Sequence, residues 1–223
     1  GPNHWRMRGV IEVTGGTPPA VDVSTPMYQA LGLDIDTPHP AAALPQVRPS
    51  AARGQQQSAA LPDGFRVRED FITRPPSEIW QALRQEPLTT HLSDAEVWDL
   101  VAYLWRSTTT DEALEQGQRL FAQNCAACHG ERGAGDGVMA PSIRQGMSDS
   151  PQAGSMEAVG TAPAGPAAFT DPSTMLGASS ALLQGKILRG GMGTGMPYWG
   201  PILTEAQMWA LVDYLWTFQV GET

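Results

Sequence analysis

Apolar residues recur at helical spacing in two separate stretches of the chain, residues 92–105 and 203–216. The stretches align without a gap, and Leu, Ala, Trp, Leu, Val, Tyr, Leu and Trp coincide. Ser93 is a good N-cap that forms a capping box with Glu96, and Thr204 caps the second stretch in the same way. Matching aromatic positions and a matching cap favour duplication over two unrelated amphipathic helices.

The same periodicity predicts three more helices. One begins at Pro75-Pro76-Ser77-Glu78, one is capped by Thr110 and runs to about Asn124, and a short one covers residues 179–189. Residues 144–168 and 190–200 are rich in small residues and glycine, and we expect them to form loops. The pattern therefore predicts a mainly α protein.

The first 64 residues carry few regular signals. Residues 10–13 alternate weakly, as in a short strand, residues 36–49 are rich in proline, and residues 55–57 are three glutamines that are typical of a linker. We interpret residues 1–64 as an extended arm that lies over a partner or over the body of the protein.

Composition narrows the functional classes. With 41% apolar and 17% charged residues, the 223-residue chain is expected to be globular. Its net charge of −9 argues against a nucleic-acid partner and favours a partner with a basic docking face. No apolar run is long enough to span a bilayer, and no signal peptide is visible.

The only two cysteines stand in the motif Cys125-Ala-Ala-Cys128-His129. A disulfide, a redox pair and half of a zinc site are alternative interpretations of such a pair. The other histidines, His4, His39 and His91, form no metal-like spacing with it, and the motif follows a helix rather than a strand. Cysteines one helical turn apart followed by histidine are typical of covalent haem attachment.

The chemistry of a bound haem assigns roles to further residues. His129 would be the proximal ligand through one ring nitrogen, and the other nitrogen needs an acceptor, for which we expect the carbonyl of Pro141. Met196 is the leading distal ligand because the glycines of residues 193–200 let the backbone approach the ring closely. Met192 and Met139 are competitors, and Met196 as a mere packing residue is the remaining alternative.

Residues 111–219 resemble a class I cytochrome c. The resemblance rests on the haem motif with Gly130, on Gly135-Asp136-Gly137, on Ala168-Phe169-Thr170-Asp171-Pro172, on Met196-Pro197 and on the terminal helix with Tyr214. It implies one haem c, His129/Met196 ligation of the iron, and a crossing of the first and last helices at Gly117, where Phe121 contacts Tyr214. It also implies that Trp199, Tyr198 and Arg189 line the propionate side.

Residues 77–105 resemble only the second half of such a domain, without a Cys-x-x-Cys-His or a Met-Pro. We interpret residues 65–109 as a degenerate haem-less repeat that serves as a scaffold or docking surface, and residues 110–223 as the class I cytochrome c domain. His91 beside the capped helix is not expected to be a ligand.

The resemblance implies electron transfer by a haem that cycles between Fe(II) and Fe(III). We expect redox protein partners or a place as subunit of a membrane respiratory or photosynthetic complex, such as alternative complex III, on the extracytoplasmic side. Because haem c is attached after export, we expect a leader to have been removed, and peripheral or lipid-anchored membrane association stays open. The alternatives are a labile distal site that binds or senses a small molecule, and an N-terminal binding module.

Overall fold

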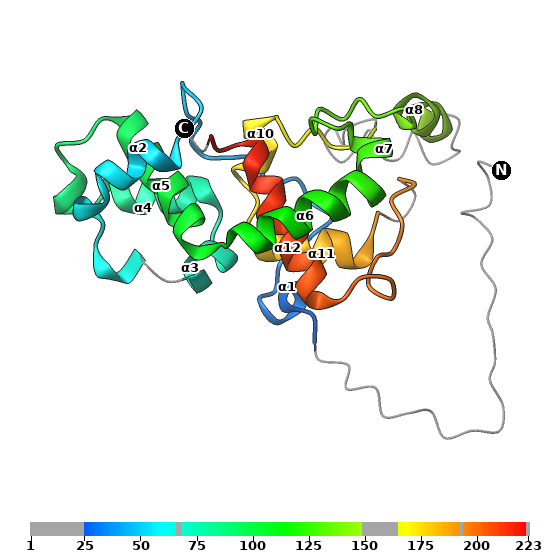
Figure 1. Ribbon diagram of the computed structural model, residues 1–223, viewed down its shortest axis with the longest axis horizontal. Helices are drawn as coiled ribbons and strands as arrows, with labels where there is room; N and C mark the ends of the chain where they lie inside the picture. The colour runs from blue at the N-terminus through cyan, green and yellow to red at the C-terminus, as the bar shows by residue number, and fades with distance from the viewer. Residues whose placement is uncertain (1–24, 66–67, 149–164, 192–193, 222–223) are drawn as a thin grey trace, which may run out of the picture.

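The computed structural model describes residues 25–65, 68–148, 165–191 and 194–221, and these are mainly helical (Figure 1). The weak strand expected at residues 10–13 lies outside these ranges. Within them, extended pairing is limited to two isolated bridges, Ser50 with Gly221 and Gly191 with Met196. No helix of the described part is long and apolar enough to cross a membrane.

The helices form two adjoining groups (Figure 1). The first group consists of α2 (Ala51–Gln56), α3 (Arg68–Thr73), α4 (Pro76–Arg84) and α5 (Asp94–Thr108). The second group consists of α6 (Asp111–Asn124), α7 (Ala126–His129), α8 (Ala140–Ser148), α10 (Pro172–Met175), α11 (Ser180–Arg189) and α12 (Glu205–Leu215). A short α1 (Met27–Ala30) lies against α11, and single 3-10 turns occur at Ser58–Ala60, Asp63–Phe65, Pro87–Thr89 and Trp216–Phe218.

Both predicted repeat helices begin as their sequences indicate. The Glu96 carboxylate accepts a bond of 2.8 Å from the Ser93 amide, and the Ser93 hydroxyl accepts one from the Glu96 amide. Thr204 and Gln207 make the equivalent pair of bonds at 2.9 and 3.2 Å at the start of α12. The two capping boxes confirm the helix starts, and such a cap contributes about 1 kcal/mol.

A close backbone contact joins α6 to α12. A methyl group in place of the Gly117 hydrogen would lie 2.1 Å from the carbonyl oxygen of Ala210 and 2.6 Å from Tyr214 Cβ. Nearby, the rings of Phe121 and Tyr214 pack with their centroids 5.5 Å apart. The crossing implied by the resemblance is therefore confirmed, and it requires glycine because the two backbones leave no room for a side chain.

The first helical group repeats this crossing. A methyl group at Gly54 of α2 would lie 1.9 Å from the carbonyl oxygen of Asp99 and 2.8 Å from Tyr103 Cβ, both in α5. In the alignment of the two stretches, Asp99 and Tyr103 coincide with Ala210 and Tyr214. Thus α2 occupies the position relative to α5 that α6 occupies relative to α12.

The linker predicted at residues 55–57 is wrong. Gln55 and Gln56 belong to α2, which is capped by the Ser50 hydroxyl and packs on α5. The composition of the glutamine run indicated a linker. In the structure, Gly54, which precedes the run, lets α2 pack closely on α5. Residues 51–56 are therefore helical rather than part of an extended arm.

The described part of the arm lies on the body of the protein. We call residues 25–49 the strap. The strap donates from the Ala41 amide to the Ser173 carbonyl at 2.8 Å and from the Arg48 guanidinium to the Val220 carbonyl at 3.0 Å. At its end, the Pro49 carbonyl accepts a bond of 2.8 Å from the Gly221 amide. The end of the strap is therefore tied to the C-terminal end of the described residues.

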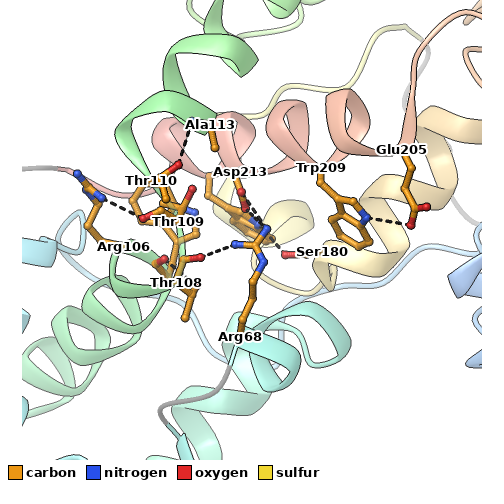
Figure 2. Close-up of polar contacts among 12 residues, drawn as sticks. Arg68, Arg106, Thr108, Thr109, Thr110, Ala113, Ser180, Glu205, Trp209 and Asp213 are labelled. Atoms are coloured by element: carbon orange, nitrogen blue, oxygen red, sulfur yellow. Dashed lines mark hydrogen bonds and ion pairs between the residues drawn. The ribbon is translucent and has the colours of Figure 1, made fainter.

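An ion pair links the two groups through α3 (Figure 2). Arg68 donates to the Asp213 carboxylate of α12 at 2.9 Å and to the Thr108 carbonyl of α5 at 2.5 Å. About one helical turn further along α3, Phe71 packs edge-on against Trp216, with ring centroids 5.7 Å apart. Burial raises the pKa of the Asp213 carboxyl, and the charge of Arg68 opposes that rise.

We predict that Gly54→Ala and Gly117→Ala each lower the free energy of unfolding by about 1–3 kcal/mol or more, because each added methyl overlaps a backbone oxygen. Thermal and denaturant unfolding of the purified variants measures the loss. Gly146→Ala in α8 is the matched control, since nothing lies within 4 Å of its added methyl. A neutral Gly54→Ala would contradict the close crossing of α2 and α5.

We predict that Arg68→Leu lowers the free energy of unfolding by about 1–2 kcal/mol near neutral pH, because Asp213 is left buried without its cation. The loss of Arg68 raises the folded-state pKa of Asp213 further above its unfolded value. A raised folded pKa costs stability once pH exceeds the unfolded pKa, so the deficit shrinks as pH falls into the acidic range of that carboxyl. Urea unfolding of both proteins across pH measures it, and a pH-independent deficit would contradict the assignment.

Candidate functional site

The two cysteines and the histidine lie where α6 gives way to α7. The Cys125 carbonyl accepts bonds from the Cys128 amide at 3.1 Å and from the His129 amide at 2.9 Å, so the motif forms one helical turn. Side chains three and four residues apart share a face of such a turn. Both thiols are free rather than joined in a disulfide. The turn therefore brings the three predicted residues together.

The electrostatic surroundings separate the alternative interpretations of the cysteine pair. Burial, with the neighbouring Cys128, raises the pKa of the Cys125 thiol to about 11, and burial also raises the pKa of Cys128. Reactive redox cysteines instead have lowered pKa values. No group of three or more His, Cys, Asp or Glu residues that could hold a metal ion occurs in the described ranges. The raised thiol pKa values argue against a reactive redox pair.

A backbone carbonyl fixes the ring of His129. Its Nδ1 lies 3.0 Å from the carbonyl oxygen of Ala167, so Nδ1 donates and Nε2 keeps its lone pair for a metal. Burial lowers the pKa of His129, although the bond to Ala167 opposes this shift. The imidazole is therefore favoured in its neutral form, which is the form that ligates a metal.

The acceptor predicted for this ring is wrong. Pro141 is an exposed residue in the first turn of α8, and Ala167 supplies the carbonyl oxygen instead. Any residue type can supply a backbone carbonyl, so the identity of residue 167 does not reveal the acceptor. A long insertion also separates Ala167 from the motif. The signal that could have located the acceptor was the segment Ala168–Pro172, which belongs to the resemblance and begins one residue after Ala167.

An aromatic cluster, which sequence reasoning missed, supports the histidine. The Phe169 ring stacks on the His129 ring, with centroids 4.5 Å apart and 22° between the planes. Phe169 in turn contacts Phe121 and Phe218, with ring centroids about 6 Å apart. Its amide donates to the Gly133 carbonyl and its carbonyl accepts from the Gln219 side chain, both at 2.6 Å. The imidazole is thus held on one face as well as at Nδ1.

The Met196 loop folds back on the end of α11. The Gly191 amide donates to the Met196 carbonyl at 3.2 Å, and Gly190 has φ +67° and would meet the Pro197 carbonyl oxygen at 2.3 Å if it carried a methyl group. Met196 is half-buried and packs against the hydrophobic core. Of its competitors, Met139 is 51% exposed, and Met192 lies outside the described residues.

The remaining predicted site residues differ in their surroundings. Trp199 is half-buried against the core, whereas Tyr198 is 59% exposed. The Arg189 guanidinium forms a two-contact ion pair with Asp36 of the strap, one contact being 2.8 Å long. A propionate at Arg189 would therefore compete with Asp36, a partner that the sequence did not reveal.

The residues present fit a covalently attached haem. Two neutral thiols on one helical turn match the two thioether bonds, and the fixed His129 ring offers Nε2 beside them. Met196 adds a soft thioether in a loop where a methyl group at Gly195 would meet only Ile143 Cγ1, at 3.9 Å. The chain thus offers a histidine nitrogen and a methionine sulfur as candidate ligands for a haem iron.

Comparison with known proteins gives a family match for the C-terminal part of the chain. Residues 114–219 match the cytochrome c family. No curated protein matches the chain. One chain of a reducing HAO-like protein complex from Kuenenia stuttgartiensis is 18% identical; 64% of this chain and 71% of that chain are covered, with a TM-score of 0.38.

A likeness as weak as this last one carries no argument about function. The family match stands on its own, and it spans the haem motif, the Ala167 acceptor and the Met196 loop. The C-terminal part of this mainly helical chain is a cytochrome c domain.

Proposed function

We propose that the chain binds one haem c through Cys125 and Cys128 and transfers single electrons, with His129 and Met196 as axial ligands. The observation that carries this proposal is the His129 ring held by Ala167 beside two free thiols, within a stretch that matches the cytochrome c family. An iron with both axial positions filled has no place for a substrate, so the chain acts as a carrier rather than an enzyme.

The protein's own residues tune the haem, which supplies the Fe(II)/Fe(III) couple. Ala167 accepts the Nδ1 proton of His129 and so raises the basicity of Nε2. Phe169 covers one face of that ring and excludes water from it. The soft thioether of Met196 favours the reduced iron and raises the potential relative to ligation by two histidines.

We propose that this carrier works on the extracytoplasmic side and exchanges electrons with a redox protein or with a membrane oxidoreductase, of which alternative complex III is one example. The net charge of −9 favours a basic docking face on that partner. The strap adds no support for anchoring to a complex, because the contacts seen for it are with the chain's own α10, α11 and C-terminal end. Shuttle and subunit therefore differ in an observable way: only a subunit stays with washed membranes.

We predict that Met196→Ala removes the sulfur-to-iron charge-transfer band of the ferric protein and lowers the midpoint potential by roughly a hundred millivolts or more, because the thioether is lost. An optical and redox titration of the purified proteins measures both. Met139→Ala is the control that should keep the band, since Met139 is half exposed. Both variants should still give one haem per chain as the pyridine haemochrome.

Two results would contradict the ligand assignment. A band that survives Met196→Ala and disappears in Met139→Ala would assign the other methionine. A wild-type ferric protein without the band would favour the labile distal site that binds a small molecule.

We predict that Phe169→Ala lowers the midpoint potential by roughly a few tens of millivolts, because water then reaches the face of the His129 ring and stabilises the ferric iron. Phe169→Leu should restore most of the potential, since it refills the space without an aromatic ring. Haem content and the charge-transfer band should stay as in the wild type. An unchanged potential in Phe169→Ala would show that the ring contact does not shield the ligand.

A further inference from the structure

The strap lies on α11, the helix that precedes the Met196 loop (Figure 1). In α1, Tyr28 lies so close to α11 that a methyl group at Gly185 would come within 2.8 Å of its Cβ. Further along the strap, the buried side chain of Ile35 belongs to the hydrophobic core. The strap therefore packs on α11 over more than one turn of the helix.

Two cationic side chains in the last turn of α11 contact oxygen atoms of the strap. Lys186 donates from Nζ to the Ile35 carbonyl at 2.8 Å, and Arg189 pairs with the Asp36 carboxylate. Burial lowers the pKa of Lys186, whereas Asp36 opposes that shift. The two cations are three residues apart, where like charges repel each other. The strap thus supplies the oxygen atoms that keep this pair of cations at the helix end.

The same helix end carries the Met196 loop. The Leu188 carbonyl accepts a bond of 3.0 Å from the Gly200 amide, and the Gly191 amide donates to the Met196 carbonyl. Both sides of the loop are thereby attached at residues 188–191, next to Arg189. A shift of this turn would carry Met196 with it.

We propose that the strap positions the distal ligand: Asp36 and Ile35 hold the last turn of α11 through Arg189 and Lys186, and this turn keeps Met196 on the iron. The inference rests on the proposed function in that Met196 is the ligand. Asp36 is a positioning residue, because it acts through Arg189 and touches neither the thioether nor its loop. Loosening the strap makes Met196 easier to displace by an added ligand.

The test uses the ferric holoprotein and imidazole as the displacing ligand, with the decay of the charge-transfer band followed by stopped flow. Asp36→Asn should increase the apparent rate or affinity of imidazole binding about two- to fivefold, the range expected from one partly exposed ion pair. Added salt should bring imidazole binding by the wild type closer to that of Asp36→Asn, and it should change imidazole binding by the variant little. Lys186→Met, which removes the bond to Ile35, should act in the same direction.

Asp111→Asn is the matched control. It removes a carboxylate from an exposed pair with Arg106 at the start of α6, away from α11. Imidazole binding should stay as in the wild type. Equal acceleration by Asp111→Asn would overturn the proposal, because a general loss of negative charge would then explain the effect.

The inference and the proposed function fail in different ways. Unchanged imidazole binding in both Asp36→Asn and Lys186→Met, with the band present in every protein, overturns the role of the strap and leaves Met196 as the ligand. Absence of the band from the wild-type ferric protein overturns the ligand assignment, and the strap proposal with it.

Discussion

The backbone contact between α6 and α12 at Gly117 is the constraint on which the candidate site depends. It brings Phe121 of α6 next to Tyr214 and Phe218, so the aromatic cluster forms at the crossing. Phe169 joins this cluster and presents its ring to His129. The His129 ring is thus oriented by aromatic residues packed at this crossing, and a wider crossing would loosen the imidazole.

The first helical group has the same close glycine crossing, but its sequence lacks the Cys-x-x-Cys-His motif. Gly54 crosses α5 as Gly117 crosses α12, yet two 3-10 turns follow α2 where the haem motif and α8 follow α6. The aligned tryptophans record the difference: Trp216 donates to the Ser180 hydroxyl at 3.0 Å, whereas the buried Nε1 of Trp105 has no partner among the described residues. An unpartnered buried donor costs about 1–3 kcal/mol, so the surroundings of the two aligned tryptophans are not equivalent.

Sequence reasoning succeeded where a short stretch of chain determines its own structure. The capping boxes and the extent of α6 depend on residues within a few positions of one another, and the structure agrees with them. It failed where distant segments meet. The acceptor at Ala167 is a backbone atom, α2 is stabilised by packing against α5, and Asp36 reaches Arg189 across most of the chain. None of these contacts has a periodicity or a spacing that could be seen in advance.

The two proposed axial ligands are held by different physical means. His129 is fixed by aromatic packing and by a hydrogen bond to the backbone, both of which are nearly indifferent to salt. Met196 sits on a glycine-rich loop whose base is held by a partly exposed ion pair, an interaction that ions screen. A change in the electrostatic surroundings, such as a charged partner close to the strap, would therefore act on the thioether side and leave the histidine in place. Because the thioether stabilises the reduced iron, such a partner would change the potential through the ligand that is held least firmly.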